Sequence, residues 1–175
     1  MPATTDTDTA RPPLTSIVAE LALGLSPCLV LGSLPLAAQL VAHIDGAIFG
    51  ELRLPPRKLL RRHDGSFGAL RVARDALPWA PKSFAAIIAV DTLDHGDAGA
   101  ALAEYCRCLE EGGTLIVVEA LRGAAGHALR SFGRGLRRFA PEDLTALLLN
   151  AEVSAPRQRW PAERYVVTVG QLRRT

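Results

Sequence analysis

The stretch DALPWAPKSFAAIIAVDTLDH (residues 75–95), followed closely by ALAEYCRCLEEGGTLIVVE (residues 101–119), decides the fold of this chain. Residues 83–93 are apolar almost throughout, which is typical of a strand that is covered on both faces. Residues 97–113 predict a helix that ends at a glycine pair, the usual residue type at a helix C-terminus. Residues 114–121 are a second apolar strand. The order strand, helix, strand favours a parallel β–α–β arrangement.

The same alternation extends outward in both directions along the chain. Further strands are predicted at 28–32, 46–54 and 69–77, and further helices at 14–25, 35–44 and 140–153. Two last strands, at 153–160 and 164–173, lie close enough in sequence to form an antiparallel hairpin. The sequence therefore predicts an α/β fold: a mostly parallel, seven-stranded, Rossmann-like sheet with helices on both faces and an antiparallel C-terminal hairpin.

Length and composition indicate one globular domain. Of the 175 residues, 49% are hydrophobic and 22% charged. Residues 1–13 are polar and rich in proline, so we expect a disordered tail followed by a single domain over 14–175. The tail does not resemble a signal peptide, and no apolar run reaches the roughly eighteen residues that span a bilayer.

Charge and cysteine content narrow the function classes. The net charge of +2 creates no general attraction for polyanions. Cys106 and Cys108 are two positions apart on a predicted helix and point to opposite sides, and Cys28 lies in a predicted strand. We therefore expect neither a disulfide framework nor a metal site, and a cytoplasmic location.

Polar residues gather where the predicted parallel strands end. In open α/β sheets, ligands bind beyond the carboxyl ends of the strands, near the point where the strand order reverses. This rule brings Gly32, Glu51, Asp75 and residues 91–95 to one edge of the sheet. We expect the functional site at this edge.

Several ordered motifs resemble those of the class I S-adenosylmethionine-dependent methyltransferases, most closely the UbiE-like type that acts on small molecules. That family has an acidic residue, then Leu-Pro-aromatic, a Ser-Phe strand start, a helix with Glu and Arg-x-Leu, and a Gly-Gly pair. The matching residues here are Asp75, Leu77, Pro78, Trp79, Ser83, Phe84, Glu104, Arg107, Leu109, Gly112 and Gly113. The resemblance runs from about residue 28 to the C-terminus.

The resemblance implies S-adenosylmethionine as the cofactor and assigns residues to it. Gly32 and Ser33 fall on the loop after the first strand. Glu51 falls where the family's acid accepts hydrogen bonds from both ribose hydroxyls. Asp75 and Ala76 fall where the adenine is bound. For the two acids, the structural alternative is a solvated carboxylate at a strand end, or an ion pair with a nearby arginine.

The first loop departs from the family pattern. An acidic residue followed by Gly-x-Gly-x-Gly is usual there, and this chain has Val30, Gly32, Leu34 and Leu36 at those four positions. The replaced glycines would have let the backbone approach a ligand closely. The replaced acid would have interacted with the cofactor's amino group. These losses count against cofactor binding.

Candidate catalytic residues follow the fourth strand. Methyl transfer is an in-line displacement that needs positioning and, for some acceptors, a proton acceptor. The candidate bases at the end of the fourth strand are Asp91, Asp94 and His95. We favour His95 and Asp91, and His95 first, because an unperturbed histidine titrates near neutral pH. The alternative is a polar loop in which Asp94 or Asp97 caps the following helix.

Three functions remain open on the sequence. The first is a methyltransferase with a small-molecule acceptor. The second is a catalytically inactive relative that binds a protein partner or a second copy of itself without cofactor. The third is nucleic-acid binding through the arginines of 53–74 and 122–138, which we do not expect because such runs are usually solvated and aromatic residues for base stacking are few.

Overall fold

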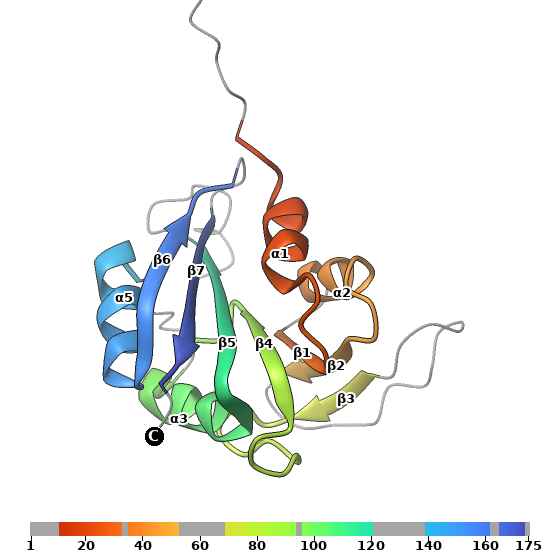
Figure 1. Ribbon diagram of the computed structural model, residues 1–175, viewed down its shortest axis with the longest axis vertical. Helices are drawn as coiled ribbons and strands as arrows, with labels where there is room; N and C mark the ends of the chain where they lie inside the picture. The colour runs from red at the N-terminus through yellow and green to blue at the C-terminus, as the bar shows by residue number, and fades with distance from the viewer. Residues whose placement is uncertain are drawn as a thin grey trace, which may run out of the picture.

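The computed structural model describes residues 11–32, 35–52, 69–93, 96–120, 139–161 and 165–173. Within these residues one sheet has the strand order β3-β2-β1-β4-β5-β7-β6 (Figure 1). Its strands are β1 (Cys28–Gly32), β2 (Ile48–Leu52), β3 (Ala69–Val72), β4 (Phe84–Val90), β5 (Leu109–Ala120), β6 (Val153–Arg159) and β7 (Tyr165–Leu172).

The pairing of the strands confirms the predicted mixed sheet. β1 runs parallel to β2 and β4, and the pairs β2–β3 and β4–β5 are also parallel. β7 is antiparallel to both β5 and β6 and forms the C-terminal hairpin with β6. The strand order reverses at β1, between β2 and β4, so the carboxyl ends of these strands form the edge where the sequence places the site.

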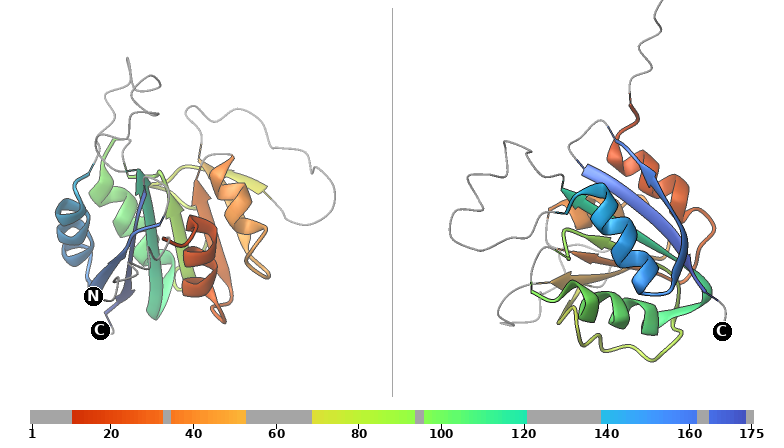
Figure 2. Two further views of the ribbon diagram at one scale, coloured as in Figure 1. Left: turned by 90° about the horizontal axis from the view of Figure 1, so that it is seen from above. Right: turned by 90° about the vertical axis from the view of Figure 1, so that its left-hand side faces the viewer.

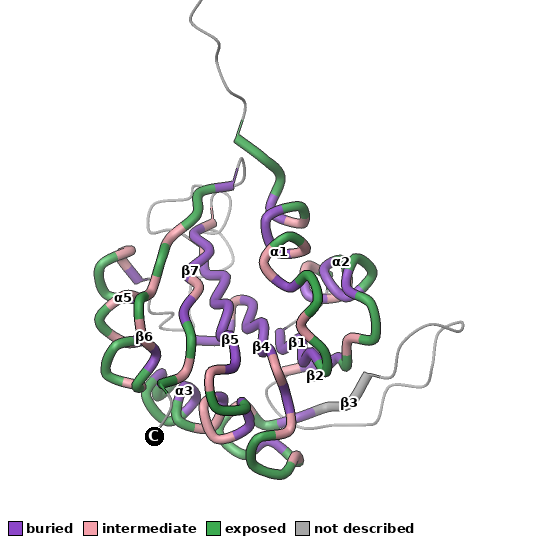
Figure 3. The backbone as a smooth tube through the Cα atoms, viewed as in Figure 1, coloured by how far each residue is buried: buried purple, intermediate pink, exposed green. Residues whose placement is uncertain are grey.

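Helices cover both faces of the sheet (Figure 2). α1 (Leu14–Ala22) and α2 (Leu36–Val41) lie on one face, and α3 (Ala98–Cys108) and α5 (Pro141–Asn150) lie on the other. Each face has its own apolar cluster, and alternate residues of β1 supply both: Leu29 and Leu31 face α3 and α5, whereas Val30 faces α1 and α2. The central strands are accordingly buried along most of their length (Figure 3).

The glycine pair at 112–113 does not end the helix before β5, so that prediction is wrong. α3 ends at Cys108, and Leu109 already adopts an extended conformation opposite Phe84 of β4. The register then shifts so that Thr114 pairs with Ala86, and residues 110–113 form an irregularity within the strand. Gly112 has φ +77°, a conformation that glycine adopts without strain. The glycines therefore serve a bulge in β5.

The β3–β4 connection (residues 73–83) contains no helix and lies against α3 instead. Glu104 of α3 accepts a hydrogen bond from the Leu77 backbone N–H at 2.7 Å. Arg107 donates to the carbonyl oxygens of Leu77 and Trp79 and to the Glu104 carboxylate. The Trp79 ring meets Phe84 edge-on, with 5.5 Å between centroids. The residues that carry the resemblance thus fix the connection between two parallel strands.

Candidate functional site

Gly32 and Glu51 lie side by side at the carboxyl ends of β1 and β2, where they are partners in the strand register. The predicted juxtaposition of these two residues is therefore present. Glu51 is fully buried, with 0% of its surface exposed. A buried carboxylate at a strand end can accept two hydrogen bonds from adjacent hydroxyl groups, which is the chemistry that a ribose requires. In this conformation, solvent does not reach it.

The backbone at Gly32 is closely surrounded by protein. A Cβ atom on Gly32 would lie 2.8 Å from the Val90 carbonyl oxygen and 2.9 Å from the Ala37 Cβ. Glycine is required here for the approach of β1 to β4 and α2, whether or not a ligand is present. Val30, at the position of the family's first acid, is completely buried in the apolar cluster under α1 and α2.

The remaining first-loop residues divide into two groups. Leu36 is half-buried in the first turn of α2 and packs against the same apolar cluster as Val30. Ser33 and Leu34 lie outside the described residues. The described part of the loop therefore supplies packing contacts, and the proposed role of Ser33 stays a prediction.

Asp75 and Ala76 form an exposed turn after β3, which ends at Val72 rather than at residue 77 as predicted. The strand ends early because the Ala76 N–H donates to the Ala73 carbonyl oxygen at 3.2 Å and reverses the chain. Arg74, in the same turn, donates from Nη1 to the Thr92 carbonyl oxygen at 3.1 Å. The turn after β3 and the segment after β4 are thereby brought together at the predicted edge.

Asp91 follows directly after β4, which ends at Val90, and is partly exposed. Its φ is +49°, an uncommon value that aspartate tolerates better than most residues. Its carboxylate accepts hydrogen bonds from the Ala120 N–H and from the Tyr165 hydroxyl, both at 3.2 Å. The candidate proton acceptor is thus fixed by groups from β5 and β7. His95, the other catalytic candidate, lies outside the described residues.

Sequence reasoning missed Glu119 and Tyr165, which stand beside Asp91. Glu119 is 2% exposed at the end of β5, and its Oε1 accepts hydrogen bonds from the Thr92 and Leu93 backbone N–H groups, each at 2.9 Å. A charged residue inside the apolar run LIVVEA was the available signal. Tyr165 gave none, because aromatic residues are ordinary at the start of a strand.

Two buried groups carry shifted pKa values: Tyr105, near this edge, and Cys28, which begins β1 at the opposite end of the strand. Burial raises the pKa of the Tyr105 hydroxyl, which lies on α3 within reach of the charges of Glu119 and Arg74. Burial also raises the pKa of the Cys28 thiol to about 12, so this cysteine stays protonated at neutral pH. Asp97 caps α3 by accepting hydrogen bonds from the Gly99 and Ala100 N–H groups, as the structural alternative predicted.

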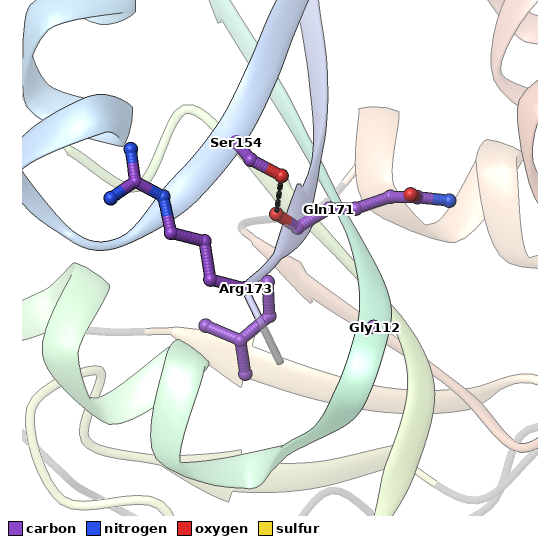
Figure 4. A pocket seen from close by; sticks show the side chains of 5 residues that line it. Gly112, Ser154, Gln171 and Arg173 are labelled. Carbon is purple, nitrogen blue, oxygen red and sulfur yellow. Dashed lines mark hydrogen bonds between the residues drawn. The ribbon is translucent and has the colours of Figure 1, made fainter. Parts of the chain in front are cut away.

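A shallow groove of about 370 Å³ lies at the opposite end of the sheet, beside the start of β5 and the end of β7 (Figure 4). Ser154 donates there to the Gln171 carbonyl oxygen at 3.0 Å. The side chains of Gln171 and Arg173 point in different directions, so no set of polar groups converges on a ligand. The groove is remote from the candidate residues and adds nothing to the site.

The described residues hold no group of three His, Cys, Asp or Glu side chains that could bind a metal ion. In the same part of the chain, the three cysteines are free thiols. None of the helices that the structure describes is both long and apolar enough to cross a membrane.

The residues present fit one half of S-adenosylmethionine better than the other. Glu51 places a carboxylate beside Gly32, where the resemblance expects the ribose, although it is buried in this conformation; the turn at Asp75 and Ala76 is exposed. The amino-acid half lacks its usual acid, because Val30 belongs to the core. The described residues therefore match the resemblance at its ribose acid, Glu51, and depart from it at Val30.

Comparison with known proteins places the fold. No family model matches the chain, and no curated protein matches it. Among solved structures, a SAM-dependent methyltransferase from Thermotoga maritima is 19% identical with a TM-score of 0.65, over 91% of this chain and 89% of that one. The Burkholderia thailandensis 1,6-didemethyltoxoflavin-N1-methyltransferase, bound to S-adenosylhomocysteine, is 16% identical with a TM-score of 0.61, over 91% and 76%.

A third similar structure belongs to an enzyme that is named for a different reaction. The [4+2]-cyclase SpnF is 18% identical with a TM-score of 0.63, over 93% of this chain and 80% of that one. At such low identities, the matches show that the chain has the Rossmann-like fold of the S-adenosylmethionine-dependent methyltransferases. The reaction has to be argued from the site, because one fold hosts many activities.

Proposed function

We propose that this protein is an S-adenosylmethionine-dependent methyltransferase with a small-molecule acceptor. The observation that carries the proposal is the position of Glu51, a buried carboxylate at the end of β2 that is paired in register with Gly32. Two carboxylate oxygens at this place suit the two ribose hydroxyls of a nucleoside. The fold shared with known methyltransferases supports the same assignment.

In this proposal the edge of the sheet divides into a cofactor side and an acceptor side. Gly32, Ser33 and Glu51 hold the ribose side of the cofactor, and Asp75 with Ala76 holds the adenine. The bound cofactor would supply a methyl group on a positively charged sulfur.

Asp91 and His95 face the acceptor in this proposal. The hydrogen bonds from Ala120 and Tyr165 hold the Asp91 carboxylate in place, so it can orient the acceptor or take its proton. A fixed orientation matters because positioning supplies much of the rate enhancement in a displacement reaction.

A second candidate function is a binding or scaffolding subunit that uses no cofactor. The closed state of the site favours it: Glu51 is completely buried, and protein atoms fill the space next to Gly32. The core position of Val30 removes the usual contact for the cofactor's amino group. A protein partner or a second copy of the chain would then be the ligand.

Calorimetric titration with S-adenosylmethionine and S-adenosylhomocysteine separates the two functions. We expect the wild-type protein to bind with micromolar affinity and Glu51→Gln to bind about 10- to 100-fold more weakly, because a charged acceptor is replaced by a neutral one. Glu142→Gln is the matched control, since Glu142 is exposed on α5. No heat at millimolar ligand, from protein that is folded by circular dichroism, would support the cofactor-free function instead.

A further inference from the structure

Arg74 joins two turns at the candidate site. It lies two residues beyond β3, in the turn closed by the hydrogen bond from the Ala76 N–H to the Ala73 oxygen. Its Nη1 donates to the carbonyl oxygen of Thr92, two residues beyond β4, at 3.1 Å. A single guanidinium therefore connects the turn assigned to adenine with the turn that carries Asp91.

The absence of a side chain at Gly96 leaves room for the Arg74 guanidinium. A Cβ atom at Gly96 would collide with Nη2 of Arg74. Gly96 also has φ +67°, a conformation that disfavours most other residues. The guanidinium thus donates to the Thr92 carbonyl, and its Nη2 occupies the space that a side chain on Gly96 would take.

Glu119 holds the same turn from the other side. The Thr92 N–H donates to Glu119, whereas the Thr92 carbonyl accepts from Arg74. Glu119 comes from β5 and Arg74 from just beyond β3, so Thr92 is held between two elements on opposite sides of β4. Loss of Arg74 would leave Thr92 held by Glu119 alone, so the hydrogen bonds of the Thr92 and Leu93 N–H groups to Glu119 would open more often.

We propose that Arg74 is a positioning residue for the nucleoside site: it holds the β4–α3 turn against the β3 turn before a ligand enters. The inference rests on the proposed function, which places the nucleoside at these turns. Its physical basis is preorganisation, since a turn that is already ordered loses less conformational entropy when a ligand binds. A planar guanidinium reaches both the Thr92 carbonyl and the space beside Gly96, whereas a lysine ammonium presents a single point charge.

The test combines hydrogen exchange of the ligand-free protein with S-adenosylhomocysteine titration. Two variants disrupt the contact between the Arg74 guanidinium and the Thr92 carbonyl. Arg74→Ala removes the guanidinium, and Gly96→Asn displaces it. Asparagine tolerates the positive φ, and its Cβ meets only the flexible end of Arg74. Arg157→Ala, on exposed β6, is the control for the loss of one positive charge.

We expect both variants to speed amide exchange at Thr92 and Leu93 and to weaken S-adenosylhomocysteine binding about tenfold, with the control unchanged. The double variant should bind no more weakly than Arg74→Ala alone, because the two substitutions remove one contact. Arg74→Lys should recover only part of the affinity.

Three results would overturn the inference, and they are distinguishable. Unchanged exchange in Arg74→Ala shows that Arg74 does not hold the turn, whatever the ligand does. Faster exchange with wild-type affinity shows that the turn is not part of the nucleoside site. A wild-type protein that binds no S-adenosylhomocysteine refutes the proposed function and the ligand role of Arg74 together, while the exchange rates still report whether the contact orders the turn.

Discussion

Two regions of the molecule use charged residues differently: a structural half, made of α3 and the β3–β4 connection, and a ligand half at the carboxyl ends of β1 and β2. Around α3, Glu104 and Arg107 bond to each other and to the backbone of the β3–β4 connection at 2.7–3.2 Å. At the ends of β1 and β2, Glu51 is buried next to a glycine that has no room for a methyl group. The first arrangement builds the fold, and the second is where a cofactor would have to enter.

This difference explains how a chain can resemble a family in its motifs and depart from it in its cofactor loop. The matching motif residues lie mostly in the β3–β4 connection, α3 and the start of β5, where they make structural contacts. The departures at Val30 and Leu36 lie on the other side, in the cluster under α1 and α2. Motif residues that make structural contacts predict a fold, whereas activity depends on the residues of the cofactor loop and the site.

The largest expected effect is on the structural half. Phe84→Ala should lower the free energy of unfolding by about 3–5 kcal/mol, because it removes a 2%-exposed ring that packs against Trp79. Urea denaturation followed by circular dichroism measures this change. Leu23→Ala, at an 83%-exposed position, should stay within about 0.5 kcal/mol. A loss below about 1 kcal/mol for Phe84→Ala would show that the packing of the structural half contributes little to the stability of the fold.

Gly32→Ala tests whether the end of β1 is closely packed or leaves space for a ligand. We expect a loss of about 1–3 kcal/mol, because the added methyl meets the Val90 carbonyl and the Ala37 side chain. Gly46→Ala provides a contrast with strain but no collision, since Gly46 has φ +68° and open space around it. If Gly32→Ala were neutral in thermal unfolding, the end of β1 would be open, and the contrast between the two halves would weaken.

The fold was predictable from the sequence because its signals are local. Apolar runs marked β1 and β4, and the alternation of strands and helices indicated a parallel sheet. The errors came where one contact decides the path of the chain. β3 ends at Val72 because of the turn closed by Ala73 and Ala76, and Leu109 enters β5 directly because it pairs with Phe84.

The sequence predicted where the candidate site lies but not the contacts between its residues. The rule for parallel strands brought Gly32, Glu51 and Asp91 to one edge, as the structure has them. The contacts at that edge join residues far apart in sequence: Tyr165 bonds to Asp91 across 74 positions. No periodicity reports such pairs. The sequence also did not indicate that Glu51 is buried, because a carboxylate at a strand end is exposed in most proteins.

The smallest expected effect concerns the pH dependence of the structural half. The hydrogen bond from Arg107, with a further one from the Leu77 N–H, lowers the pKa of Glu104, and partial burial opposes them. A carboxyl group whose pKa is lowered by folding stabilises the protein above its unfolded pKa, about 4.3. This contribution is lost as the pH falls toward the folded value. Glu104→Gln should therefore lower the Tm by about 2–4 °C at pH 7.

The difference between wild type and Glu104→Gln should narrow steadily below about pH 4, because protonated Glu104 resembles the glutamine. Differential scanning calorimetry from pH 7 to pH 3 measures it, with Glu110→Gln as the exposed control. A constant difference across this range would mean that packing, and not the charge of Glu104, supports the β3–β4 connection. The structural half would then resemble the end of β1, where close packing around Gly32 holds the backbone.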